Sequence, residues 1–440
     1  MSEAQENVVP QEERRSLDPL KTSRALIIGL VAVIIVLGAA FIFMTIANAG
    51  KTAAELGGAP VNALATSNDA CVECHRRTTP GIVEQYGRST MAAANVNCRQ
   101  CHQVEANYPG AEEHEGAMIL RSPTTAMCQK CHEQEVAQYY QSRHSLPAFV
   151  AFAGSKDLTP EQLAEYQKIP EGQYSPDKAR NAIAALEGAD ITPVTCEVCH
   201  SVGRPNLDGS TGQCQKCHLR HEFSIEQARK PETCNACHIG PDHPQWEIYQ
   251  ESAHGIAYTT MGHTWDWTAQ SGTLTAVQFP APTCAICHMS GFGNTGTTHD
   301  VGDRLTWFLF SAISERRPSW EDNKVRMQAV CLECHNTNFI ADFYDRGDKV
   351  VAQVNTWVKE SDDMMAPLKQ GGLLTDAQFD EPIDFTYFEL WHHWGRTTKF
   401  GAFMQGPDYS QWHGAYELLS DLADLKEMIN VKLTPTGPGQ

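Results

Sequence analysis

The chain has 440 residues, and its 53 acidic residues outnumber its 34 lysines and arginines, so its formal net charge is −19. A negative charge of this size argues against nucleic acid as a partner, because basic residues bind phosphate backbones. Only 20 % of the residues are charged, which excludes a largely disordered chain and leaves room for a large core or two to three average domains.

The N-terminal region has the features of a membrane anchor. Residues 25–46 contain no charge, and they are long enough to cross a bilayer and longer than the apolar part of a usual signal peptide. The basic residues of the tail 1–24 place that tail in the cytoplasm and the rest of the chain on the outer, periplasmic side. Residues 47–70 form a linker of small residues. Ala47-Asn48-Ala49 has the form of a signal-peptidase site, so cleavage there is the alternative.

The pattern Cys-x-x-Cys-His occurs eight times and uses all 16 cysteines. Two thiols three positions apart can bond the two vinyl groups of one haem, and the adjacent histidine then reaches the iron as proximal ligand. Disulfides or zinc sites do not account for this repeated spacing. The predicted attachment cysteines and proximal histidines are Cys71, Cys74 and His75; Cys98, Cys101 and His102; Cys128, Cys131 and His132; Cys196, Cys199 and His200; Cys214, Cys217 and His218; Cys234, Cys237 and His238; Cys284, Cys287 and His288; and Cys331, Cys334 and His335.

Eight covalently bound haems c within residues 71–335 leave too little protein for a separate apolar shell around each haem. We therefore predict a mainly α multihaem cytochrome c, in which short helices and loops surround eight packed haems. Thr159-Pro160-Glu161-Gln162 has the pattern of a capping box that starts a helix. No sustained alternation of apolar and polar residues predicts a sheet.

Residues 336–433 contain no cysteine and are predicted to form a helical C-terminal region. Tyr416–Leu433 has apolar residues at helical spacing, which is typical of an amphipathic helix. Such a helix packs on its own core or, as the alternative, against another subunit. The tail 434–440 is rich in proline and glycine and is predicted to be disordered.

Ten of the 18 histidines lie outside the motifs and are available as sixth ligands of the irons. An electron-transfer haem takes two protein ligands, whereas a catalytic haem keeps one position open. The count permits eight six-coordinate haems, and it equally permits seven with an open catalytic haem. Composition alone does not decide between them.

The motif order and the residues that flank the motifs match a known pattern. The matching segments between Cys214 and Trp307 are CQKCHLRHEFS, RKPETCNACHIGPDHPQWEIYQESAHG, TWDW, APTCAICHM and TTHD. In these segments, and in the number and order of its eight motifs, the chain resembles the hydroxylamine oxidoreductase family of octahaem cytochromes c. The resemblance covers roughly residues 71–430.

The resemblance implies that the fourth haem, with proximal His200, is the catalytic one and has an open distal side. Asp242 and His243 match the family's distal acid–base pair. The residues that match distal ligands are His114, His144, His221, His254, His299 and His392. The seventh distal ligand stays open, because Met91 stands where the family has a histidine; Met91, His263, His393 and His413 are the candidates.

The oxidising enzymes of this family carry a tyrosine that cross-links to the catalytic haem of a neighbouring subunit. Gln405 stands at that position here, and Tyr409 would need a gap in the alignment to replace it. The chain therefore resembles the branch that lacks the cross-link and is thought to work reductively. This implies reduction of nitrite and/or hydroxylamine to ammonia at the fourth haem, fed by seven electron-transfer haems.

Two alternatives stay open. One is oxidation of hydroxylamine or hydrazine with a cross-link from Tyr409, and the other is a non-enzymatic electron-transfer protein. The implied partners are a small nitrogen compound and either a quinol-linked or a soluble cytochrome as electron donor. The family resemblance also implies a homotrimer.

Overall fold

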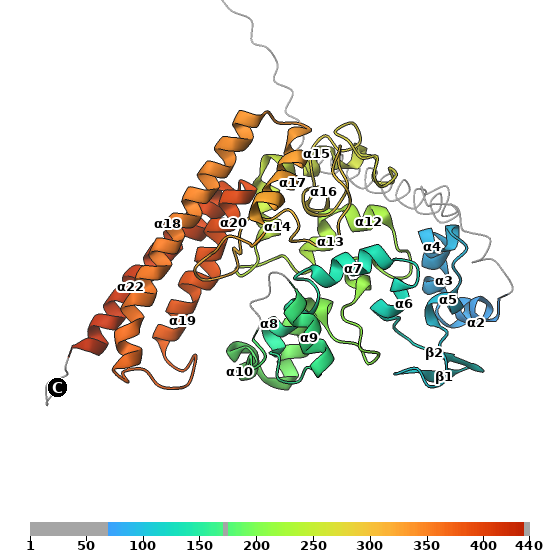
Figure 1. The fold of residues 1–440 in the computed structure, drawn as a ribbon, viewed down its shortest axis with the longest axis horizontal. Coiled ribbons are helices and arrows are strands. Elements are labelled where there is room, and N and C mark those ends of the chain that lie inside the picture. Colours follow the sequence, from blue (N-terminus) through green and yellow to red (C-terminus); the bar gives the residue numbers. More distant parts are fainter. Residues whose placement is uncertain (1–68, 170–174, 435–440) are drawn as a thin grey trace, which may run out of the picture. The chain divides into compact units, whose positions relative to one another are not determined.

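The computed structural model describes residues 69–169 and 175–434 (Figure 1), which belong to the second of two units of the chain, Asn62–Gln440. The predicted tail at 1–24, the anchor at 25–46, almost all of the linker at 47–70 and residues 435–440 of the predicted disordered tail lie outside the described residues. Within the described ranges no helix is both long and apolar enough to cross a membrane.

The mainly helical architecture predicted from the sequence is confirmed. From residue 70 to residue 288 the helices are α2 (Ala70–Thr78), α3 (Pro80–Gly87), α4 (Thr90–Ala93), α5 (Cys98–His102), α6 (Thr125–Gln129), α7 (Glu133–Gln141), α8 (Leu146–Ala153), α9 (Pro160–Lys168), α10 (Ala182–Ile191), α11 (Cys196–His200), α12 (Ile225–Arg229), α13 (Pro231–Asn235), α14 (Gln245–Glu251), α15 (Ala253–Met261) and α16 (Cys284–His288). The C-terminal helices are α17 (Trp320–Leu332), α18 (Thr337–Gln370), α19 (Pro382–Glu389), α20 (Arg396–Met404), α21 (Pro407–Ser410) and α22 (Glu417–Leu433), with π-helical turns η6 (Leu390–Gly395) and η7 (Gln411–Tyr416).

Three of the motifs form a single helical turn that begins at the first cysteine. These are α5, α11 and α16, and polar side chains cap two of them: Asn97 accepts from the backbone of Gln100, and Thr283 accepts from that of Ile286. A helical turn places residues three and four apart on one face. Both cysteines and the histidine of such a motif therefore point to the same side, as attachment of one haem requires.

The described residues contain one small sheet, in keeping with the absence of a strand pattern in the sequence. It is the antiparallel hairpin of β1 (Glu112–His114) and β2 (Ala117–Ile119). Glu115 and Gly116 both have positive φ in its two-residue turn, the geometry that suits the twist of a tight hairpin.

Two helices begin where the sequence predicts. Thr159 and Gln162 form the predicted capping box, with hydrogen bonds of 3.2 and 2.9 Å, and Pro160 is the first residue of α9. The amphipathic helix predicted over Tyr416–Leu433 is α22, which begins one residue later. Both predictions are confirmed, because capping and apolar periodicity are local properties.

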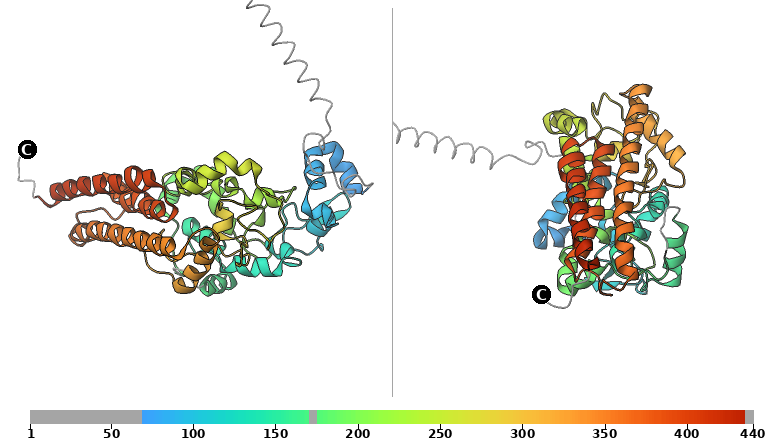
Figure 2. Two further views of the ribbon diagram at one scale, coloured as in Figure 1. Left: turned by 90° about the horizontal axis from the view of Figure 1, so that it is seen from above. Right: turned by 90° about the vertical axis from the view of Figure 1, so that its left-hand side faces the viewer.

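The C-terminal helices form their own apolar core. Figure 2 shows α18 and α22 side by side, and α22 also packs against α19. Leu418, Leu422 and Leu425 of α22 are buried against Val354 and Val358 of α18. The amphipathic helix thus packs on its own chain, as the first of the two alternatives predicts.

This packing predicts that two leucines of α22 contribute very differently to the free energy of unfolding. Leu425 is 0 % exposed and Leu419 is 44 % exposed. We expect Leu425→Ala to lower the free energy of unfolding by about 2–5 kcal/mol, because a cavity remains in the core. The matched change Leu419→Ala should cost less than about 0.5 kcal/mol. Urea unfolding followed by circular dichroism measures both, and equal losses would contradict the assigned packing of α22.

Candidate haem centres and distal site

None of the sixteen cysteines forms a disulfide, and several motifs that are distant in sequence meet in space. Cys128 of the third motif lies beside Cys214 of the fifth. In the same way, Cys199 of the fourth motif meets Cys237 of the sixth. The motifs therefore form one spatial cluster, as haems in mutual contact would need.

Four proximal histidines are held by hydrogen bonds at Nδ1. The partners are the carbonyl oxygen of Leu120 for His102 at 2.7 Å and that of Ala148 for His200 at 2.6 Å. His75 meets the Thr79 hydroxyl at 2.7 Å, and His238 meets the Gln245 side-chain oxygen at 3.2 Å. A hydrogen bond at Nδ1 fixes the ring and leaves Nε2 for a metal. Each of these rings is therefore oriented as a haem ligand would be.

Five proximal histidines face a second histidine ring. Two imidazoles that bind one metal from opposite sides have their ligating nitrogens about 4 Å apart, and their ring centres are therefore roughly 6 Å apart. The observed separations lie between 5.8 and 6.3 Å. The pairs are His75 with His114, His102 with His221, His238 with His144, His218 with His299, and His335 with His254. The ring of His243 also lies 6.2 Å from that of His238, but at a steeper angle of 73°.

Among the described residues, no histidine ring faces His132, His200 or His288 in this way. The ring nearest to His200 is that of Phe152, at 5.5 Å between centres. Of the six predicted distal ligands, five therefore lie opposite a proximal histidine. His392 does not.

Apolar side chains beside the motifs fit a haem. Val198 lies within the fourth motif and Leu332 within the eighth, while Leu219 and Ile239 follow the fifth and sixth; about half of each side chain is exposed. Exposed apolar residues at such positions are the surface that a bound macrocycle covers. Together with the paired imidazoles and the free thiols, they form a donor set and an apolar surface suited to covalently bound haem c.

The predicted acid–base pair lies in a network of charged side chains. Asp242 Oδ2 lies 2.6 Å from His243 Nδ1, while its Oδ1 lies 2.5 Å from an Arg396 guanidinium nitrogen and 2.9 Å from His392 Nδ1. The same Arg396 nitrogen lies 2.9 Å from His392 Nε2. Both ring nitrogens of His392 therefore face protein groups.

The electrostatics of this network keep Asp242 ionised. Burial alone would raise the pKa of Asp242, but its contacts with His243 and His392 and the positive charge of Arg396 outweigh burial and hold that pKa well below its usual range. Burial lowers the pKa of His392 to about 4, partly offset by the nearby Asp242 carboxylate. The network therefore presents a carboxylate next to His243 and a neutral imidazole at His392.

The remaining candidates for the seventh ligand lie apart from these pairs. Met91 is in α4, and His263 is exposed after α15. His393 is half-buried beside His392, with 5.4 Å between ring centres. His413 is exposed and pairs with Asp408 at 2.7 Å. None of them faces the ring of a proximal histidine within the described chain.

The two residues that bear on the cross-link lie close together near α21. Tyr409 stacks on His413 at 5.0 Å between ring centres, and its backbone N–H donates to Glu251. Gln405 ends α20 with positive φ. The structure thus places Tyr409 against a side chain of its own chain.

Sequence reasoning missed Arg396 and Phe310. Phe310 packs on the His243 ring at 5.0 Å between centres and accepts a hydrogen bond from Arg396 Nε through its carbonyl oxygen at 2.7 Å. Arg396 follows His392 by four positions on consecutive helical turns, a spacing that places both on one face. The four-residue spacing of His392 and Arg396 could have identified Arg396 from the sequence. The contact between Phe310 and His243 joins distant segments, so no local sequence pattern predicts it.

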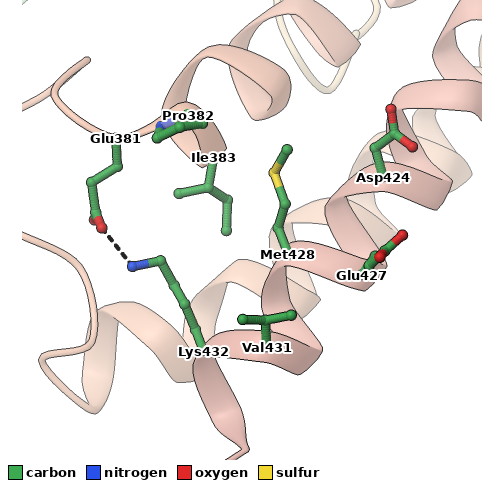
Figure 3. Close-up of a pocket in the computed structure, with 8 residues that line it drawn as sticks. All are labelled: Glu381, Pro382, Ile383, Asp424, Glu427, Met428, Val431 and Lys432. Atoms are coloured by element: carbon green, nitrogen blue, oxygen red, sulfur yellow. Dashed lines mark hydrogen bonds and ion pairs between the residues drawn. The ribbon is translucent and has the colours of Figure 1, made fainter. Parts of the chain in front are cut away.

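A separate pocket of ≈ 420 Å³ lies between the start of α19 and the end of α22 (Figure 3). Glu381 and Lys432 form an ion pair across it at 2.5 Å. None of the predicted site residues lines it, so it is distinct from the haem centres. Its lining residues are Glu381, Pro382, Ile383, Asp424, Glu427, Met428, Val431 and Lys432.

Comparison with known proteins identifies a family of multihaem cytochromes. The family profile described as seven times multi-haem cytochrome CxxCH matches residues 94–382, a range that holds seven of the eight motifs. A protein of Kuenenia stuttgartiensis named as a probable nitrite reductase–hydroxylamine oxidoreductase fusion is 31 % identical over 338 residues, or 64 % of this chain. This chain covers only 35 % of that relative's length.

Two solved structures share the fold. A hypothetical multihaem protein superposes with a TM-score of 0.70 at 23 % identity, over 82 % of this chain and 95 % of the other. The reducing HAO-like protein complex of Kuenenia stuttgartiensis gives a TM-score of 0.62 at 19 % identity, over 83 % and 85 % of the two chains. The resemblance to the hydroxylamine oxidoreductase family found in the sequence is thereby confirmed.

The charge network predicts that Asp242 stabilises the fold more than a surface carboxylate does. Asp242→Asn should lower the free energy of unfolding by about 2 kcal/mol, because the buried Arg396 loses a charged acceptor. The control Asp345→Asn breaks an exposed pair with Lys349 and should cost at most about 1 kcal/mol.

This stabilisation should also depend on pH. The pKa of Asp242 is lower in the folded than in the unfolded chain, so the effect is complete above about pH 4 and is lost as pH falls toward the folded pKa. Urea titrations of wild type and both variants at several pH values measure this. Equal effects of the two substitutions at neutral pH would refute the assigned role.

Proposed function

Because the chain belongs to the family of multihaem cytochromes with repeated Cys-x-x-Cys-His motifs, we propose that it is an octahaem enzyme that reduces nitrite and/or hydroxylamine to ammonia. The observation that carries this proposal is the environment of His200. No histidine ring faces it among the described residues, whereas five other proximal histidines have such a partner. Asp242 and His243 lie within electrostatic range of it.

Seven haems serve electron transfer in this proposal, and the fourth keeps an open position. His114, His221, His144, His299 and His254 would be the distal ligands of the first, second, sixth, fifth and eighth haems, an assignment that the ring separations support. The distal ligands of the third and seventh haems come from the remaining candidates, Met91, His263, His392, His393 and His413.

Spatial contacts between motifs support an electron path to the fourth haem. Cysteines that touch or lie within electrostatic range link the first motif to the second, the second to the third, the third to the fifth, the fifth to the sixth, the sixth to the seventh, and the seventh to the eighth. The fourth motif meets the sixth through Cys199 and Cys237. Electrons that enter at the first or the eighth motif can therefore pass along this series of motifs to the sixth, and from there to the site beside His200.

Cys196, Cys199 and His200 would hold the fourth haem, whose iron would supply redox chemistry toward a small nitrogen compound. His243 supplies protons, because its Nδ1 is held by Asp242 and its Nε2 is left for transfer. Asp242 holds the orientation of the His243 ring through this contact. Phe310 covers one face of the ring and limits the access of water to that face.

The oxidative alternative needs a cross-link from Tyr409 to the haem of a neighbouring subunit. The stacking of Tyr409 on His413 does not favour it, since Tyr409 would have to leave that contact. The electron-conduit alternative needs a distal ligand on the fourth haem. Detection of one high-spin haem that binds an external ligand would separate the enzyme from the conduit.

We also propose that residues 25–46 anchor the protein, with its haems on the periplasmic side, because haem c is attached there and the apolar segment is long enough to span a bilayer. The electron donor is then a quinol-linked or a soluble cytochrome. A reducing HAO-like protein is known as part of a complex, which supports a partner protein. A homotrimer is the assembly that the family resemblance implies.

The first test is turnover by the haem-loaded protein. We expect nitrite and hydroxylamine each to oxidise a reduced viologen dye, with ammonia as product. His243→Ala should slow turnover by about 10²–10⁴-fold, the usual contribution of a general acid. The control Asp345→Asn changes an exposed carboxylate of α18 outside the haem-binding residues and should keep wild-type rates. No turnover of either substrate by wild type would refute the reductase proposal.

A second test addresses the ligand pairs. His254→Ala should convert one low-spin haem into a high-spin haem, because His335 would lose the ring that faces it. Electron paramagnetic resonance of the oxidised protein counts the high-spin irons. The control Ile256→Ala alters an exposed residue of the same helix and should leave the count unchanged. An unchanged count in His254→Ala would exclude this histidine as a ligand.

A further inference from the structure

Arg396 contacts three residues of the distal site, namely Asp242, His392 and Phe310. Its side chain is only 11 % exposed. One guanidinium nitrogen contacts both Asp242 Oδ1 and His392 Nε2, and Nε donates to the carbonyl oxygen of Phe310. The guanidinium also lies over the Phe310 ring, at 5.4 Å from its centre. One side chain therefore joins the acidic partner of His243 to the aromatic residue that covers it.

Phe310 belongs to a loop, residues 307–316, that we call the distal loop. An isolated bridge between Trp307 and Arg316 closes its base. Asn355 of α18 exchanges two hydrogen bonds of 2.8 Å with the backbone of Ser314. The loop thus starts and ends on rigid structure, while its tip at Phe310 reaches the His243 ring.

Helix α20 holds the tip of this loop at two points, one turn apart. Arg396 binds the Phe310 carbonyl, and Lys399, which is fully buried, donates to the Ser311 carbonyl at 3.0 Å and to the Ser314 hydroxyl at 2.8 Å. Thr397 adds a contact to the carbonyl of Pro241, next to Asp242. The C-terminal helices therefore support the distal site as well as their own core.

We propose that Arg396 is the positioning residue of the distal site, which sets the Asp242 carboxylate and the Phe310 ring at the same time and thereby fixes His243. The proposal rests on the proposed function for its effect on turnover. Its geometric basis is the planar guanidinium, whose several donors point in fixed directions. A lysine ammonium would keep the charge but not reach both the carboxylate and the carbonyl.

A positioning role differs from simple attraction of an anionic substrate. Displacement of a catalytic group by about 1 Å can cost roughly 10²-fold in rate. Arg396→Ala should therefore lower kcat about 10²-fold for nitrite and for neutral hydroxylamine alike, with little change in KM. A rise in KM for nitrite alone would overturn the proposal in favour of charge attraction.

Conservative replacement and chemical rescue sharpen the test. Arg396→Lys should lose most of the activity, whereas methylguanidinium in solution should restore part of it to Arg396→Ala and none to His243→Ala. In the His243→Ala background, Arg396→Ala should cause no further loss, because both changes act through one group. Full activity of Arg396→Lys, or additive losses in the double variant, would contradict the proposal.

Arg229→Lys is the matched control. Arg229 is also buried, but it donates to the carbonyls of Trp267 and Ala269 and to Ser271, away from the distal site. This variant should keep kcat, even where its stability falls. A loss of kcat equal to that of Arg396→Lys would mean that any buried arginine is needed only for folding.

A readout that does not use activity separates this proposal from the proposed function. Hydrogen–deuterium exchange of residues 308–314 should become faster in Arg396→Ala and stay unchanged in Arg229→Lys, because only the first loses a bond to the loop. If wild type were inactive but exchange changed in this way, the proposed function would fail and the positioning role would stand. Unchanged exchange in Arg396→Ala would overturn the positioning role whether or not the enzyme turns over.

Discussion

The structure depends on the distance between paired imidazole rings that come from distant parts of the chain. Each proximal histidine directly follows the second cysteine of its motif. A second histidine ring that faces it must therefore come from another part of the chain. Five such histidines lie opposite their partners at 5.8 to 6.3 Å between ring centres. The loops and short helices between motifs are arranged so that these distant residues meet.

This constraint accounts for the shortness of the helices between the motifs. A long helix or a sheet would hold neighbouring motifs at fixed spacings, whereas short helices and turns let each motif orient separately. The apolar clusters of the motif region are small, because a haem supplies much of the buried surface. The C-terminal helices α18, α19 and α22, which carry no motif, instead bury a continuous protein core.

The distal site combines both parts of the molecule. Asp242 and His243 follow the sixth motif, while Arg396, His392 and Lys399 come from the C-terminal helical region. The buried guanidinium offsets the cost of burying the Asp242 carboxylate, because it supplies an opposite charge at 2.5 Å. The C-terminal region therefore supplies the electrostatic support of the predicted acid–base pair.

The sequence by itself determined the features that depend on short spacing. The eight motifs, the attachment cysteines, the capping box at Thr159 and the helix α22 all follow from residues within a few positions of one another. The family resemblance further identified the five histidines whose rings face those of proximal histidines. The predicted anchor lies outside the residues that the structure describes.

Only the tertiary structure decided how distant residues combine. It placed His392 against Asp242 and Arg396, although the family resemblance implied a haem ligand at this position. It also brought Phe310 onto the His243 ring across 67 positions of the chain. The physical reason is that hydrogen bonds and ring contacts between remote segments depend on how the helices pack, and no local periodicity encodes that packing. The haem-attachment motifs are therefore encoded locally, whereas the charge network around Asp242 and His243 exists only in the folded chain.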